Sequence, residues 1–117
     1  MVIKDIVIKN PSDKAISAGE NSTISGENIK VFGGEIGVVS KDLSKVHLTD
    51  LSIINTRLGL SAFQKKSEYG VASIEISKLI LENNELDYLI ENRSSLIIDN
   101  VAVETVSNNV ILSLIHI

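Results

Sequence analysis

The stretch Lys45–Leu60, KVHLTDLSIINTRLGL, carries the pattern that decides the fold. Apolar and polar residues alternate over two or three positions, polar residues interrupt them, and a further short alternation follows. Alternation with a period of two over so few residues is typical of brief β-strands with one face inward. Helical spacing of apolar residues is not sustained anywhere in the chain. The stretch therefore predicts short strands that are joined by polar corners.

The same pattern returns about every 22 residues. The first residues of its apolar-x-apolar triplet lie 23, 22, 28 and 22 residues apart, and they are Ile6, Ile29, Leu51, Leu79 and Val101. A column three residues earlier consists of Ile3, Gly26, Leu48, Ile76 and Ile98, and a later column begins with Ala15, Ile36, Leu58 and Leu86. A fixed period in this range is typical of a solenoid, whose repeats bury their apolar faces by stacking. We therefore expect an all-β solenoid of about five stacked coils.

One interval is six residues longer than the others, and its extra residues fall between positions 62 and 73. We expect a loop that projects from one corner, where binding residues often gather. Two aromatic rings suited to stacking on a sugar and three charged groups suited to bonding its hydroxyls form the candidate ligand-binding site: Phe63, Lys65, Lys66, Glu68 and Tyr69. In the alternative interpretation, Phe63 folds inward and fills the widened coil.

The coil length, the three short strands per coil and the Asn after the second strand, at Asn10, Asn55 and Asn83, resemble the right-handed parallel β-helix repeat of the pectate-lyase-like superfamily. The run at residues 36–44, followed by 58–60 and 64–70, is similar to terminal β-helices of bacterial surface proteins. The resemblance implies a right-handed parallel β-helix with one loop insertion and an extracellular or cell-surface location.

The leucine-rich repeat is the main alternative fold, because Leu48-x-x-Leu51-x-Ile53 matches the strand of that repeat and the periods overlap. That repeat needs a helix in the rest of each unit, and residues 37–40 are poor helix formers. The pattern favours the β-helix.

Two polar columns follow from this alignment. The residue before the later apolar column is Lys14, Glu35, Arg57 and then Glu85, so charge signs alternate, which parallel stacking would favour. Asn10, Asn55 and Asn83 form another column that Gly33 interrupts, and both residue types tolerate left-handed backbone at a corner.

Composition and charge limit the classes of partner that the chain can bind. The chain has 117 residues, of which 44% are hydrophobic and 3% aromatic, so its core must consist of small aliphatic side chains. A net charge of −4 argues against nucleic acid as a partner. No apolar run reaches the ~18 residues of a membrane span, so we expect no membrane insertion. The absence of cysteine excludes thiolate metal sites.

The residue pattern predicts no catalytic constellation, metal site or cofactor. The aspartates are dispersed, and those at corners, such as Asp5, Asp50 and Asp99, are typical turn formers. His47 lies between Val46 and Leu48, so alternation turns it outward, where a lone histidine is usually plain surface.

We expect residues 1–111 to be a fragment of a parallel β-helix and residues 112–117 to be a non-native tail, because this apolar hexapeptide resembles a translated sequencing adapter. The predicted function is a structural or interaction scaffold, with polysaccharide as a candidate partner and upstream coils of the same polypeptide as another. The alternative is the terminal portion of a polysaccharide lyase or glycoside hydrolase whose catalytic coils lie upstream.

Overall fold

The computed structural model of the chain describes residues 1–64, 70–91 and 93–103. This part of the chain is built from β-strands and contains no helix. The strands are β1 (Val2–Lys9), β2 (Lys14–Ala18), β3 (Thr23–Phe32), β4 (Ile36–Lys41), β5 (Lys45–Ile54), β6 (Leu58–Phe63), β7 (Ser73–Glu82), β8 (Leu86–Ile90), β9 (Ser95–Ile98) and β10 (Val101–Ala102). The structure agrees with the predicted all-β class. The leucine-rich repeat alternative is wrong, because each described repeat has a strand where that fold needs a helix.

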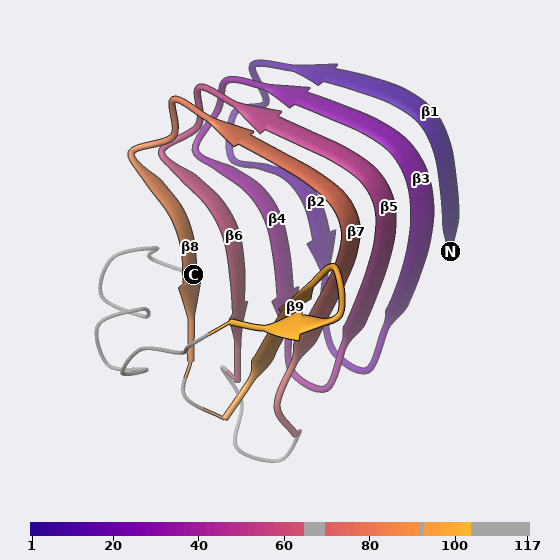
Figure 1. Cartoon of the computed structure of the whole chain (residues 1–117). Helices are drawn as coiled ribbons and strands as arrows, with labels where there is room; N and C mark the ends of the chain where they lie inside the picture. Colours follow the sequence, from indigo (N-terminus) through magenta and orange to yellow (C-terminus); the bar gives the residue numbers. More distant parts are fainter. Residues whose placement is uncertain (65–69, 92, 104–117) are drawn as a thin grey trace.

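The strands form two sheets, here called sheet A and sheet B (Figure 1). Sheet A has the order β1-β3-β5-β7-β9-β10, and sheet B has the order β2-β4-β6-β8. Every pair is parallel except β9–β10. From β1 to β9 the chain alternates between the sheets, so each repeat adds one strand to each of them.

The parallel register superposes the residues that the repeat pattern aligned. Ile6, Ile29, Leu51 and Leu79 are successive pairing partners. The earlier column is confirmed over all five members: Ile3, Gly26, Leu48, Ile76 and Ile98. Aliphatic side chains are therefore stacked on aliphatic side chains through the middle of sheet A.

One predicted column is wrong in its first repeat. Lys14, not Ala15, pairs with Ile36, and the N–H of Ile36 bonds to the carbonyl oxygen of Asp13 at 3.0 Å. The charge column therefore begins with Asp13 instead of Lys14, so its first two members, Asp13 and Glu35, are both acidic and the predicted alternation of signs is wrong at this step. Its second and third members are correct, because Nε of Arg57 donates to Oε2 of Glu35 at 2.7 Å.

Two columns of left-handed residues bend every repeat at the same places. The Asn column is confirmed, with φ values of 48°, 76°, 62° and 55° at Asn10, Gly33, Asn55 and Asn83. A second column lies in the middle of each long strand of sheet A and consists of Asp5, Asn28, Asp50 and Lys78. These residues bend the long strands, whose curvature is visible in Figure 1. Asn and Asp suit such positions because they adopt left-handed backbone more readily than other non-glycine residues.

The main hydrophobic core lies between the two sheets. Ile29, Leu51 and Ile53 of sheet A and Val38 and Leu60 of sheet B belong to it, and each is fully buried or nearly so. A second buried cluster consists of Ile36, Val39, Leu58, Phe63 and Leu89, all from sheet B. Because the neighbours Val38 and Val39 lie in different clusters, the central strands β4 and β6 are buried on both faces, where alternation predicts one inward face only. The outer strands β2 and β8 each keep exposed side chains.

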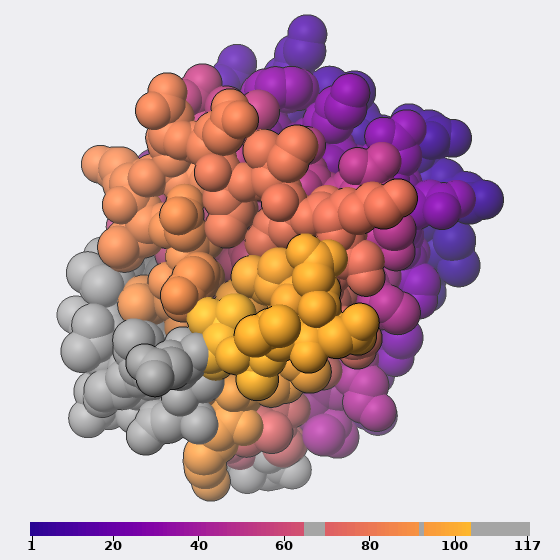
Figure 2. Space-filling view, in the orientation of Figure 1, coloured from indigo at the N-terminus to yellow at the C-terminus, as the bar shows by residue number. Residues whose placement is uncertain are grey.

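The fifth repeat departs from the stack. Val101, the predicted fifth anchor, pairs with Ile98 in an antiparallel hairpin, so that prediction is wrong. The cause is the two-residue loop Asp99–Asn100, in which both residues are left-handed, as the tightest hairpins require. The hairpin lies over the C-terminal end of the stack in Figures 1 and 2.

The left-handed column yields a first prediction. Asn55, which is exposed and has φ 62°, should tolerate Gly but not Ala. We expect Asn55→Ala to lower the free energy of unfolding by about 1 kcal/mol, because a Cβ without a polar group disfavours left-handed backbone. Urea unfolding followed by circular dichroism measures the loss, with Asn55→Gly as the control. Equal stability of Ala and Gly at this position would contradict the assigned backbone conformation.

Candidate functional site

The outward face of the first halves of the long strands carries an ordered set of mainly polar side chains. Two columns line it, and we call them together the sheet A outer surface. One column is Val2, Ser25, His47 and Glu75, and the other is Lys4, Glu27, Thr49 and Ser77. Alternation along each strand turns these side chains away from the core, whose residues occupy the positions between them.

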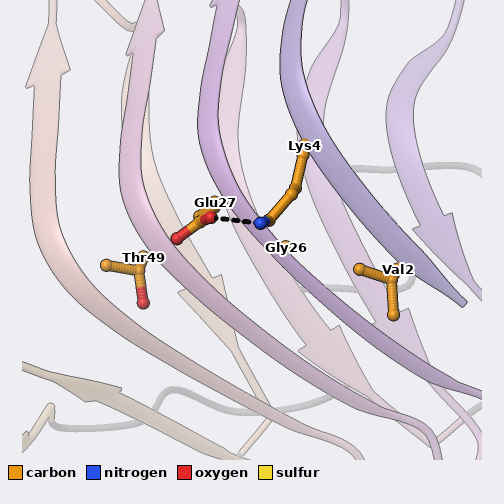
Figure 3. A pocket seen from close by; sticks show the side chains of 5 residues that line it. All are labelled: Val2, Lys4, Gly26, Glu27 and Thr49. Atoms are coloured by element: carbon orange, nitrogen blue, oxygen red, sulfur yellow. Dashed lines mark ion pairs between the residues drawn. The ribbon is translucent and has the colours of Figure 1, made fainter.

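A shallow groove of about 220 Å³ crosses this surface (Figure 3). It is lined by Val2, Lys4, Gly26, Glu27 and Thr49 from three adjacent strands. Gly26 contributes only backbone, and a Cβ there would lie 2.8 Å from the carbonyl oxygen of Ile3. The glycine therefore allows β3 to approach β1 closely. The groove is smaller than the 300–1,000 Å³ typical of pockets for drug-sized ligands, so it suits a single small polar group.

An ion pair crosses the groove. Nζ of Lys4 lies 3.0 Å from Oε1 of Glu27, and both side chains are more than half exposed. The pKa of Lys4 is raised, because its ammonium donates a hydrogen bond to the Glu27 carboxylate and is also attracted by its charge. The groove thus offers an ammonium donor and a carboxylate acceptor to solvent, groups that suit the hydroxyl groups of a ligand.

The register also aligns Ser25, His47 and Glu75 as lateral neighbours on three successive strands. The sequence pattern predicts His47 to be an isolated outward residue, because these three positions are 22 and 28 residues apart and form no local motif. All three side chains are exposed. In this structure, no described hydrogen bond links the hydroxyl of Ser25 to a base.

The predicted loop site is only partly described. Phe63 is fully buried and packs in the second cluster with Val39 and Leu58, so its ring is not available to a sugar in this structure. The burial of Phe63 agrees with the alternative interpretation, but the ring belongs to the second cluster and not to the main core between the sheets. Lys65, Lys66, Glu68 and Tyr69 lie outside the described residues, and their role in binding stays a prediction.

A buried carboxylate anchors the start of this inserted segment. Glu91 is 2% exposed, and its Oε2 accepts a hydrogen bond from the N–H of Gln64 at 3.2 Å. Its Oε1 is buried without a hydrogen-bond partner. Arg93 donates to the side-chain oxygen of Gln64 at 3.0 Å. Sequence reasoning missed Glu91, because alternation does not predict a carboxylate buried at a corner.

The corner aspartates act as structural residues where the structure describes their contacts. Asp5 accepts a hydrogen bond from the side-chain amide of Asn28 at 2.8 Å, and Asp99 accepts one from the N–H of Lys78 at 2.9 Å. Among residues 1–64, 70–91 and 93–103, no three His, Asp or Glu side chains are grouped so that they could hold a metal ion. The same residues include no helix long and apolar enough to cross a membrane.

Comparison with known proteins adds no relative: no family model, no curated protein and no solved structure matches the chain.

The burial of Phe63 yields a second prediction. Phe63→Ala should lower the free energy of unfolding by about 3–5 kcal/mol, because it removes a fully buried ring from the second cluster. Phe63→Leu keeps most of the apolar volume and should cost much less. Thermal and urea unfolding measure both variants. A Phe63→Ala protein as stable as the parent chain would show that the ring does not support sheet B.

Proposed function

We propose that the chain forms part of a right-handed parallel β-helix, related to the pectate-lyase-like superfamily, that serves as a structural and interaction scaffold in an extracellular or cell-surface protein. The observation that carries the proposal is the alternation of parallel strands between two sheets, with a constant register in both. Repeats of this kind stack on their neighbours and present long surfaces to partners.

The right hand of the helix is supported by chain connectivity. Each strand returns to its own sheet as a parallel neighbour after one crossing through the other sheet. Connections between parallel strands of one sheet are right-handed in about 98% of cases, because of the twist of the strands. The left-handed residues at matching corners support the regular stacking of coils.

A scaffold role is supported by the character of the sheet A outer surface. Most of its polar side chains are exposed, and its groove offers the Lys4–Glu27 pair to solvent. Paired charges and hydroxyl groups are suited to polar ligands such as polysaccharides, and we include carbohydrate binding in the proposal. No observation on the described residues favours the lyase or hydrolase alternative, which stays a prediction about coils upstream.

The proposal is tested by a glycan-array screen of the whole chain. We expect a bound polysaccharide whose affinity falls about tenfold when Lys4 and Glu27 are both replaced by alanine, since a charge-assisted hydrogen bond is worth about 1.5–3 kcal/mol. The control replaces Lys30 and Glu82, which are exposed outside the groove, by alanine. Tyr69→Ala separately tests the inserted segment.

Each outcome decides a different part of the proposal. Loss of binding only with Tyr69→Ala would move the site to the inserted segment. Equal loss in the groove variant and its control would reject the groove. No binding by the parent chain would reject the carbohydrate role.

A further inference from the structure

A row of three side chains crosses the sheet A outer surface in an order that suits nucleophilic catalysis. Ser25 of β3 pairs with His47 of β5, and His47 pairs with Glu75 of β7. The histidine therefore has a hydroxyl group on one side and a carboxylate on the other. All three side chains are exposed, so a ligand can reach them. Such a row supplies an attacking group, a base and a group that orients the base.

The parallel register holds these three groups close together. Neighbouring strands lie about 4.8 Å apart, and directly paired residues project from the same face of the sheet. From this spacing, rotamer changes bring a hydroxyl and an imidazole nitrogen within the ~3 Å of a hydrogen bond. Catalytic hydrogen bonds commonly tighten only when the substrate binds. Strands β3, β5 and β7 each have a paired strand on both sides, so the row lies within the stack and not at either end.

The carboxylate sets the direction in which the imidazole acts. A neutral imidazole has one N–H donor and one nitrogen that accepts. When the N–H of His47 donates to Glu75, the accepting nitrogen faces Ser25 and can take its hydroxyl proton. The other charged groups beside His47 are Lys45, two residues earlier on β5, and Glu27, diagonally across on β3. These two charges have opposite signs, so neither sign dominates around the imidazole.

The groove lies beside Ser25 and provides space for an acyl group (Figure 3). Its lining includes Val2, the pairing partner of Ser25, and Gly26, the residue that follows it. A volume of about 220 Å³ suits a small acyl group. Lys4 and Lys45 lie diagonally across from Ser25 on the two adjacent strands. An ammonium group there stabilises the negative charge that develops on a carbonyl oxygen under attack.

We propose that Ser25, His47 and Glu75 form a hydrolytic site that cleaves esters of small acyl groups. The Ser25 oxygen attacks the carbonyl carbon while His47 takes the hydroxyl proton. The ester C–O bond then breaks, the leaving alcohol receives this proton from His47, and the acyl group stays on Ser25. Water, deprotonated by His47, attacks the acyl-serine; the acid leaves and the proton returns to Ser25.

This reaction differs from the cleavage of glycosidic bonds in the alternative function. The inference goes beyond the proposed scaffold role and does not depend on it.

Hydrolysis of p-nitrophenyl acetate by the whole chain tests the activity. We expect the rate to fall at least about a hundredfold in Ser25→Ala and in His47→Gln, because general-base catalysis contributes about 10²–10⁴-fold. Glu75→Gln should lower the rate at least about tenfold, because the carboxylate orients the imidazole. The rate should also fall as the pH is lowered from about 8 to about 5, because a protonated imidazole cannot accept a proton.

Ser52→Ala is the matched control. Ser52 lies on the outward face of the second half of β5, where its pairing partners are Lys30 and Ile80, so this variant should keep the full rate. Circular dichroism of each variant shows that the fold is intact.

Cysteine reactivity tests the activation by His47 without any ester. The chain has no cysteine, so Ser25→Cys introduces a single thiol. A neighbouring imidazole converts a thiol to the reactive thiolate. We expect iodoacetamide to alkylate Ser25→Cys at least about fivefold faster at about pH 7 than the double variant that also carries His47→Gln.

Two results would overturn the proposal. One is a rate of ester hydrolysis that is the same in the parent chain and in Ser25→Ala. The other is a thiol in Ser25→Cys whose alkylation rate does not change with His47→Gln.

Discussion

The structure depends on in-register parallel pairing in both sheets at once. Neighbouring strands are about 4.8 Å apart, so each side chain is stacked on its equivalents in the next repeats. The corner that leads from sheet A to sheet B has three residues in repeats two to four: 33–35, 55–57 and 83–85. A left-handed residue opens each of these corners. The aliphatic columns of the core follow from this geometry, because a shift by one residue would turn them outward.

Much of this arrangement could be read from the columns of the sequence, and the errors have local causes. The corner after β1 holds four residues, 10–13, one more than its equivalents. Pro11 and Ser12 take the place of the single residue Gly34. The apolar pair Ala15–Ile16 therefore matches Ile36–Gly37 in the sequence with a slip of one residue. Val101 continued the spacing of the repeats, but Asp99–Asn100 reverses the chain before it. At this point the two-residue turn Asp99–Asn100 determines the chain direction, and the 22-residue spacing of the repeats does not.

The candidate site was less accessible to sequence reasoning, because it consists of lateral neighbours. Ser25 and His47 are recognised as neighbours on adjacent strands only when the strand register is known. Phe63 shows a different limit. Its strand neighbours in the column are Lys41 and, by the backbone bond to Ala62, Glu91, so the column predicts a polar, outward position. The ring is buried because sheet B has no solvent-facing side at that point, a property that alternation within one strand does not reveal.

The six additional residues between β6 and β7 leave the pairing on both sides unchanged. Ala62 still pairs with Ser40, and Ser73 still pairs with Lys45, as in a repeat without an insertion. Length variation at this corner is therefore decoupled from the strand ladders. In protein engineering, foreign epitopes or affinity sequences can be inserted at this corner. In evolution, residues added here can create new surface while the strand pairing stays the same.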